Sequence, residues 1–298
     1  TYRALNPTDV DAIACVTGKP VDMGGIAGRT EATGRGVQYG LQAALADAGE
    51  SQRLGGLTPG LDGKTVVVQG LGNVGYHAAK FLSEEDGARV IAIVERDGAV
   101  VDPDGLDVEA VRAHIGEHGG VAGLPGYVED GLAVLEHECD ILLPAALEGQ
   151  ITAENAPRIR AKLVAEAANG PVTADADEIL RQRGIGVLPD FYLNAGGVTV
   201  SYFEWTQNLS HMTYGRMEKR LLQQRAEAAA TAIGLDPTTL SEADEITLVR
   251  SGLHDTMFTA YERITDVRDG DDRIDDLRTA AFVLALRQVA KWHQQYAL

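Results

Sequence analysis

The chain has 298 residues, 45% of them hydrophobic, and a formal net charge of −18 from 44 acidic and 26 basic side chains. This hydrophobic content suffices for a buried core and excludes wholesale disorder, and no apolar run reaches the roughly 20 residues of a membrane helix. The negative charge repels phosphate backbones and anionic lipids, so we expect no nucleic-acid partner and no membrane partner.

The composition also bears on the compartment. Lysine is rare beside arginine, and an acidic, lysine-poor surface resembles that of proteins from a high-salt cytoplasm, so we expect a halophilic source. The opening "TYRALNPTDV" has no signal-peptide pattern, and its lack of methionine suggests a processed or truncated product. Cys15 and Cys139 form no C-x-x-C motif, which fits a reducing, cytoplasmic compartment and disfavours a disulfide framework or a zinc cluster.

The predicted elements begin with a helix over 30–49, followed by a glycine- and proline-rich connector at 55–63. Short apolar strands then alternate with helices. Strands are predicted at 65–69, 89–94, 139–143, 162–166 and 185–188, and helices at 73–85, 107–118, 151–158 and 175–183. This alternation predicts an α/β fold with a doubly wound (Rossmann-type), mostly parallel sheet.

The strand pattern stops after about residue 195. Helices are predicted at 199–233, 241–265 and 276–296, with a charged loop at 268–276 before the last. We therefore divide the chain into a link at 1–28, a dinucleotide-binding domain at 29–200 and a C-terminal helical segment at 201–298. We expect that segment to pack on the domain and toward its cleft.

The stretch "VVVQGLGNVG" contains three glycines spaced as G-x-G-x-x-G between a predicted strand and a predicted helix. Gly70 permits a tight turn, Gly72 lets the backbone approach a pyrophosphate, and Gly75 lets the helix pack closely on the sheet. Asn73 and Val74 open the helix, where free N–H groups favour phosphate. The motif therefore predicts a dinucleotide site.

Glu95 ends the second predicted strand, 20 residues beyond Gly75. A carboxylate there can accept hydrogen bonds from the adenosine ribose hydroxyls and repel a 2′-phosphate, which favours NAD as the cofactor. Arg96 follows directly and could bind that phosphate, so NADP stays open as the alternative.

Six segments in the same order resemble the glutamate dehydrogenase family, which includes leucine, phenylalanine and valine dehydrogenases. They are "ACVTGKPVDMGGIAGRTEATGRGV" (14–37), "QGLGNVG" (69–75), "AEAANGPVT" (165–173), "PDFYLNAGGVTVSYFEW" (189–205), "SGLHDTM" (251–257) and "DLRTAAFVLAL" (276–286). The motif "GGVTVSYFEW" looks like the glutamate branch, although another amino-acid dehydrogenase is an alternative.

The resemblance implies hydride transfer between a nicotinamide cofactor and the α-carbon of L-glutamate, giving 2-oxoglutarate and ammonia, in a homohexamer. It also implies functions for individual residues. The residues that match cofactor-binding positions of the family are Arg29, Thr33, Asn73, Ala145, Ala146, Asn169 and Asn194. Ser251 matches the position whose hydroxyl binds a carboxylate of the substrate. From the residues alone, Thr33 could instead bond its own backbone, and Asn194 could cap a helix.

The resemblance also implies that the catalytic lysine, the catalytic aspartate and the substrate-binding lysines lie in an N-terminal substrate domain, for which these 298 residues show no counterpart. We therefore predict no catalytic residue in this chain. Lys19, in "TGKP", matches a family position outside the chemistry. The alternative to an active enzyme is a non-catalytic fragment that binds NAD(P).

The segment "HIGEH" suggests a different class of protein, the zinc hydrolases. It matches their H-x-x-E-H pattern and places His114 and His118 one helical turn apart. Two glycines follow at once, and no nearby predicted helix offers a third ligand. Such short motifs arise freely, so a surface helix with two histidines is the preferred interpretation and no metal site is predicted.

Overall fold

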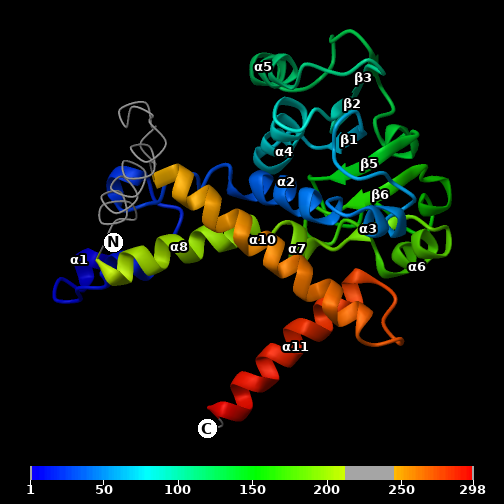
Figure 1. Ribbon diagram of the computed structural model, residues 1–298. Coiled ribbons are helices and arrows are strands. Elements are labelled where there is room, and N and C mark those ends of the chain that lie inside the picture. The colour runs from blue at the N-terminus through cyan, green and yellow to red at the C-terminus, as the bar shows by residue number, and fades with distance from the viewer. Residues whose placement is uncertain (1, 212–244, 297–298) are drawn as a thin grey trace, which may run out of the picture. The chain divides into compact units, whose positions relative to one another are not determined.

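The computed structural model describes residues 2–211 and 245–296 (Figure 1). Contacts divide the chain into two compact units. The helical unit comprises residues 1–32 and 197–256, and the sheet unit comprises residues 33–196 and 257–298.

The sheet unit contains a seven-stranded sheet in the order β4-β3-β2-β1-β5-β6-β7. The five strands from β2 to β7 in this order run parallel, with helices between them (Figure 1). Their bounds are β1 Thr65–Gln69, β2 Arg89–Glu95, β5 Cys139–Pro144, β6 Ala161–Ala165 and β7 Gly186–Leu188. The predicted doubly wound α/β class is therefore confirmed, with strand ends within one residue of the prediction.

Two further strands were not predicted. β3 (Gly98–Val101) pairs antiparallel with β2, and the short β4 (Tyr127–Val128) pairs antiparallel with β3. The turn between β2 and β3 reverses at Gly98, whose φ of +140° favours glycine. The chain therefore doubles back directly after Glu95, and the sheet is mostly rather than wholly parallel.

In the sheet unit the helices predicted at 73–85, 107–118 and 175–183 are present within one residue of their predicted ends, two other predicted helices differ from the structure, and short elements at 132–136 and 190–193 were not predicted. The observed helices are α2 Ala32–Ala44, α3 Ala48–Arg53, α4 Asn73–Glu84, α5 Val108–His118, α6 Ala174–Gln182 and α7 Asp190–Leu193, with 3₁₀ turns η3 Leu132–Glu136 and η4 Ala156–Arg158. The single helix predicted over 30–49 is two helices, because Asp47 accepts hydrogen bonds from the N–H groups of Gly49 and Glu50 and starts α3.

The helix predicted over 151–158 is wrong for most of its length. Ile151 forms a β-bridge with Val172, and the Asn155 side chain bonds the backbone of Thr152 and Gln150 at 2.8 and 2.9 Å. These local bonds compete with helical ones, so only η4 remains.

Alternate residues of the central strands face opposite sides. Val67, Leu142 and Val164 belong to one buried cluster that includes Ala176 and Leu180 of α6. The residues between them in the strands are also buried, as expected for a sheet covered on both faces. This core fixes the carboxyl ends of β1, β2, β5 and β6 along one edge.

The C-terminal part is helical, as predicted. The helices are α8 Gly196–Ser210, α10 Glu245–Asp269 and α11 Leu277–Gln295, and the predicted segments between 212 and 244 lie outside the described residues. None of the helices described is long and apolar enough to cross a membrane.

The helical unit also contains the short α1 (Tyr2–Leu5), η1 (Ala12–Cys15) and η2 (Val21–Met23). Its buried polar centre is Glu204 of α8, which is fully buried and lies 2.6 Å from Nζ of Lys19. The backbone N–H of Gly18 donates to the same carboxylate at 2.8 Å. Lys19 thus forms an ion pair that ties the N-terminal segment to α8.

Candidate dinucleotide-binding site

The glycine turn joins β1 to α4. Gly70 has φ +85°, and a β-carbon there would lie 2.7 Å from Cβ of Ala146. A β-carbon on Gly75 would lie only 1.9 Å from the carbonyl oxygen of Gly70 and 3.3 Å from Cβ of Ala145. Both positions therefore require glycine, and they place Ala145 and Ala146, which follow β5, directly beside the turn.

Gly72 differs from the other two glycines. It is the N-cap of α4, and a β-carbon there would meet no atom within 4 Å. Asn73 and Val74 form the first turn of α4 behind it, where no side chain of the cap residue covers the backbone. No protein atom lies close enough to require glycine at this position. A ligand that approaches the backbone closely here would require it.

Glu95 lies at the same turn. Its Oε1 accepts a hydrogen bond of 2.5 Å from the N–H of Leu71, between the first two glycines. The carbonyl of Leu71 accepts a 2.7 Å bond from Nη1 of Arg112, in α5. Arg96 points elsewhere, toward the carbonyl of Gly119 at 3.4 Å. Arg112 was not predicted, because no local pattern distinguishes it from other polar residues of an exposed helix face.

A network of charged side chains surrounds Tyr76 in α4. Glu109 of α5 accepts hydrogen bonds from the Tyr76 hydroxyl at 2.8 Å and from Nζ of Lys80 at 2.5 Å. These two bonds, Lys80 first, hold the pKa of Glu109 below its usual value. Lys80 is thereby bound to a carboxylate, whereas Arg112 bonds a backbone carbonyl.

The two predicted asparagines are brought together beyond β6. Nδ2 of Asn194 donates to Oδ1 of Asn169 at 2.7 Å. Asp190 supports both sides of this contact, since its carboxylate accepts from the N–H of Gly170 at 2.8 Å and its carbonyl accepts from the N–H of Asn194 at 2.9 Å. Asp190 was not singled out in the sequence, although it lies inside the motif "PDFYLNAGG".

Thr33 is the second residue of α2, and the adjacent Gly34 touches the backbone of α4 so closely that its β-carbon would lie 2.9 Å from the carbonyl oxygen of Val74. Arg29 and Ser251 belong to the helical unit. There Nε of Arg29 donates to the hydroxyl of Ser201 at 2.7 Å, and Ser251 is exposed on α10.

The two histidines of the "HIGEH" motif stack on each other with ring centres 4.1 Å apart. Nε2 of His114 contacts the carbonyl of Ala122 at 3.0 Å, and Nδ1 of His118 contacts the carbonyl of His114 at 3.1 Å. Across residues 2–211 and 245–296, no three His, Cys, Asp or Glu side chains are grouped so that they could hold a metal ion.

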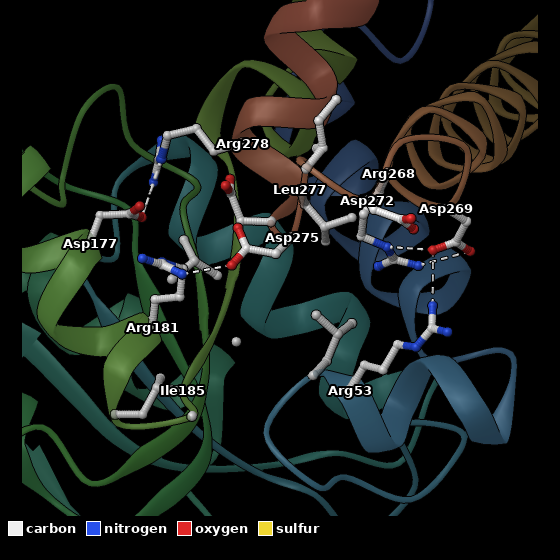
Figure 2. Close-up of a pocket in the computed structure, with 16 residues that line it drawn as sticks. Arg53, Asp177, Arg181, Ile185, Arg268, Asp269, Asp272, Asp275, Leu277 and Arg278 are labelled. Atoms are coloured by element: carbon white, nitrogen blue, oxygen red, sulfur yellow. Dashed lines mark hydrogen bonds and ion pairs between the residues drawn. The ribbon is translucent and has the colours of Figure 1, made fainter.

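A cavity of about 690 Å³ lies away from the glycine turn, at the amino end of β7. Figure 2 shows Arg53 and Arg181 on opposite walls, each directed at an aspartate, Asp269 at 3.1 Å and Asp275 at 2.7 Å. Dinucleotides bind at the carboxyl ends of parallel strands, whereas this cavity lies at the amino end of a strand, so it is not a candidate for the dinucleotide site.

Comparison with known proteins identifies the family. The model of the glutamate/leucine/phenylalanine/valine dehydrogenases matches residues 24–235, which include the glycine turn and the Asn169–Asn194 contact. The chain belongs to this dehydrogenase family. Within it, the chain is 49% identical to a probable glutamate dehydrogenase of Sinorhizobium fredii, over 97% of the chain and 68% of that protein. It is 47% identical to a mitochondrial glutamate dehydrogenase of Dictyostelium discoideum, over 97% of the chain and 59% of that protein.

Solved structures of the family agree with the fold. The glutamate dehydrogenase of Peptoniphilus asaccharolyticus matches with a TM-score of 0.71 and 30% identity, over 99% of this chain and 60% of that one. The hetero-hexameric glutamate dehydrogenase of Thermus thermophilus, in its leucine-bound form, matches with a TM-score of 0.75 and 28% identity, over 97% and 58%. The chain thus spans about three fifths of the length of these dehydrogenases.

Proposed function

We propose that this chain is the dinucleotide-binding part of an NAD(P)-dependent glutamate dehydrogenase, which interconverts L-glutamate with 2-oxoglutarate and ammonia. The observation that carries the proposal is the glycine turn, with Gly72 open, Gly75 packed against Gly70 and the Glu95 carboxylate at Leu71. High identity to proteins named glutamate dehydrogenase supports this substrate over leucine, phenylalanine or valine.

The residues of the turn fit a dinucleotide. We assign the pyrophosphate to the backbone of Gly72, Asn73 and Val74, where the positive end of α4 favours negative charge. Glu95 has a second carboxylate oxygen to accept hydrogen bonds from the adenosine ribose. The small side chains of Ala145 and Ala146 leave the sheet edge open beside the turn.

The remaining assignments concern the reacting end. When bound, the cofactor supplies the nicotinamide ring that exchanges a hydride with the α-carbon of the amino acid. We propose that Asn169 and Asn194, with Thr33 and Arg29, orient this ring and its ribose, because their amide, hydroxyl and guanidinium groups can bond a carboxamide. Ser251 would bind a carboxylate of the substrate through its hydroxyl.

We propose no catalytic acid, base or amine within the 298 residues. The experiment is to titrate the chain with NAD and NADP by calorimetry and to assay it with glutamate and either coenzyme. Nucleotide binding without turnover is the expected result. Family-like turnover would show that the chain carries its own catalytic groups, and absence of binding to folded protein would remove the dinucleotide assignment.

We further propose that NAD is preferred, because the Glu95 carboxylate repels a 2′-phosphate. Glu95→Ser should weaken NAD binding and narrow the difference between the two coenzymes. An unchanged ratio of dissociation constants would remove Glu95 from coenzyme choice.

The whole protein is proposed to be a cytoplasmic homohexamer from a halophile. The net charge of −18 supports the halophilic source, because concentrated salt screens the mutual repulsion of the carboxylates. Sedimentation of the native gene product would test the hexamer. A melting temperature of this chain that does not rise between low salt and molar KCl would contradict the halophilic source.

A further inference from the structure

Arg112 is a cation at the glycine turn whose charge is not matched by a carboxylate. Its Nη1 donates to the carbonyl of Leu71 at 2.7 Å, and within the described residues it forms no ion pair. Nearby Lys80, by contrast, is held by Glu109. The position of Arg112 is therefore fixed by the backbone of the turn and not by an acidic partner.

The guanidinium of Arg112 is held in place on two sides. Besides the Leu71 carbonyl, its Cζ lies 5.3 Å from the ring centre of Tyr76, and Glu109 anchors that tyrosine by a 2.8 Å hydrogen bond. An arginine over an aromatic face is stabilised by the ring quadrupole and keeps its remaining N–H donors at the ring edge. Arg112 therefore offers oriented donors beside the turn.

Arg112 and Glu95 flank the same residue. Leu71 donates its N–H to Glu95 at 2.5 Å and accepts from Arg112 at 2.7 Å. The nitrogen and oxygen of one residue are roughly 3 Å apart, so the carboxylate and guanidinium atoms in these bonds are at most about 9 Å apart. A ribose hydroxyl that donates to the carboxylate and a phosphate that accepts from the guanidinium, each through one hydrogen bond of about 2.8 Å, fit within such a distance.

We infer that Arg112 forms a subsite for the 2′-phosphate of NADP, next to the ribose position at Glu95. This rests on the proposed dinucleotide function and adds to it: Glu95 disfavours the 2′-phosphate, Arg112 compensates, and the site accepts NADP as a second, weaker coenzyme. Arg96, the cation that follows Glu95 in sequence, is directed at the Gly119 carbonyl and contributes less. Arginine is suited to this position, because its planar fork bonds phosphate through two N–H groups.

The test separates the phosphate from the rest of the coenzyme by using 5′-AMP and 2′,5′-ADP as probes of the adenosine end. Calorimetry with the full 298-residue chain should show that Arg112→Gln weakens 2′,5′-ADP roughly tenfold or more, the loss of one charge-assisted contact, with 5′-AMP changed less than about twofold. Arg96→Gln should leave both probes within about threefold. Added salt should weaken 2′,5′-ADP more than 5′-AMP in every chain that keeps Arg112, and this difference should be lost in Arg112→Gln.

Arg89→Gln is the matched control, because Arg89 is an exposed arginine at the opposite end of β2 and its loss changes net charge equally. Melting temperatures identify variants that fail to fold. Equal weakening of both probes in Arg112→Gln would mean that Arg112 only holds the turn, and this would overturn the inference. A phosphate effect in Arg96→Gln alone would overturn it too. If no variant and no unmodified chain binds 5′-AMP, the dinucleotide function itself fails.

Discussion

Nη2 of Arg278, in the first turn of α11, lies 2.9 Å from Oε2 of Glu166, the fully buried residue that follows β6. The same nitrogen lies 3.0 Å from Asp177 of α6. The other oxygen of Glu166 is buried without a hydrogen-bond partner. Burial raises the pKa of Glu166, and Arg278 opposes this rise. One arginine thus attaches α11 to the end of β6 and compensates a carboxylate that would otherwise be buried alone.

Arg278→Met should therefore destabilise the fold strongly. Removing one partner of a buried ion pair typically costs about 3–5 kcal/mol, because the remaining charge has no compensation. Urea unfolding measures this loss. The double variant Arg278→Met/Glu166→Gln should recover most of it, since the uncompensated charge is gone. Arg273→Gln is the control: Arg273 is exposed, so the loss of its ion pair with Asp271 should change stability little. Equal losses in the two single variants would contradict this account.

Gly72 and Gly75 should respond oppositely to alanine. Gly75→Ala places a methyl group 1.9 Å from the Gly70 carbonyl, so the turn must distort at a cost of about 1–3 kcal/mol or more. Gly72→Ala meets nothing within 4 Å, so it should cost only the N-cap preference for glycine over alanine, about 1 kcal/mol or less. It should nevertheless weaken NAD binding, because the methyl group stands where the pyrophosphate approaches the backbone.

Unfolding free energies and calorimetric titration together check this pair. Gly116→Ala serves as the control, since that glycine lies in α5 with no atom within 4 Å of its β-carbon. It should stabilise the helix by up to about 1 kcal/mol and leave NAD binding unchanged. Unimpaired NAD binding in Gly72→Ala would place the pyrophosphate elsewhere.

Asp140 should make stability sensitive to acid. It accepts bonds from the N–H of Thr65 at 2.9 Å and from Nζ of Lys162 at 2.8 Å, joining β1, β5 and β6. Burial alone would raise the pKa of Asp140, but the bonds from Lys162 and Thr65 outweigh burial and the pKa falls below 3.8. The folded state therefore binds fewer protons than the unfolded state, and this stabilisation is present above pH 3.8 and lost as pH falls through the lower folded pKa.

Urea unfolding of the unmodified chain and of Asp140→Asn from pH 3 to pH 7 tests the sign. The difference between them should be largest near neutrality and shrink in acid. Asp104→Asn, at an exposed side chain without a hydrogen bond in the structure, should show a small difference that does not vary with pH. A difference that grows toward acid would be the wrong sign and would exclude the proposed linkage.

The two cysteines should differ in reactivity. Burial raises the pKa of the Cys139 thiol to about 12, whereas Cys15 is exposed. Because the thiolate is the reactive form, one thiol per chain should react rapidly with a disulfide reagent at pH 8, and the second only in denaturant. Cys15→Ser should abolish the rapid reaction. Rapid labelling of Cys139 in that variant would show that the strand opens on the time scale of the assay.

Much of the fold followed from local sequence. The parallel strands were predictable because a strand buried on both faces must be short and continuously apolar, as "TVVVQ" and "CDILL" are. The strand β3, by contrast, has four residues and β4 has two, so their stability comes from pairing at the sheet edge and not from any periodic pattern. The false helix at 151–158 has the same origin, since a bridge to Val172 outweighed local helix propensity.

The candidate site, like the fold, could be predicted only in part from the sequence. The sequence by itself determined where the glycine turn lies and that Glu95 ends the neighbouring strand. Both depend on local constraints, namely the backbone sterics at Gly70 and Gly75 and the spacing of a strand–helix–strand unit. Only the tertiary structure decided that Arg112 reaches the carbonyl of Leu71 and that Arg278 compensates Glu166. Such charges are stabilised by partners far along the chain, and the energy of a pair depends on burial and distance, neither of which a linear pattern contains.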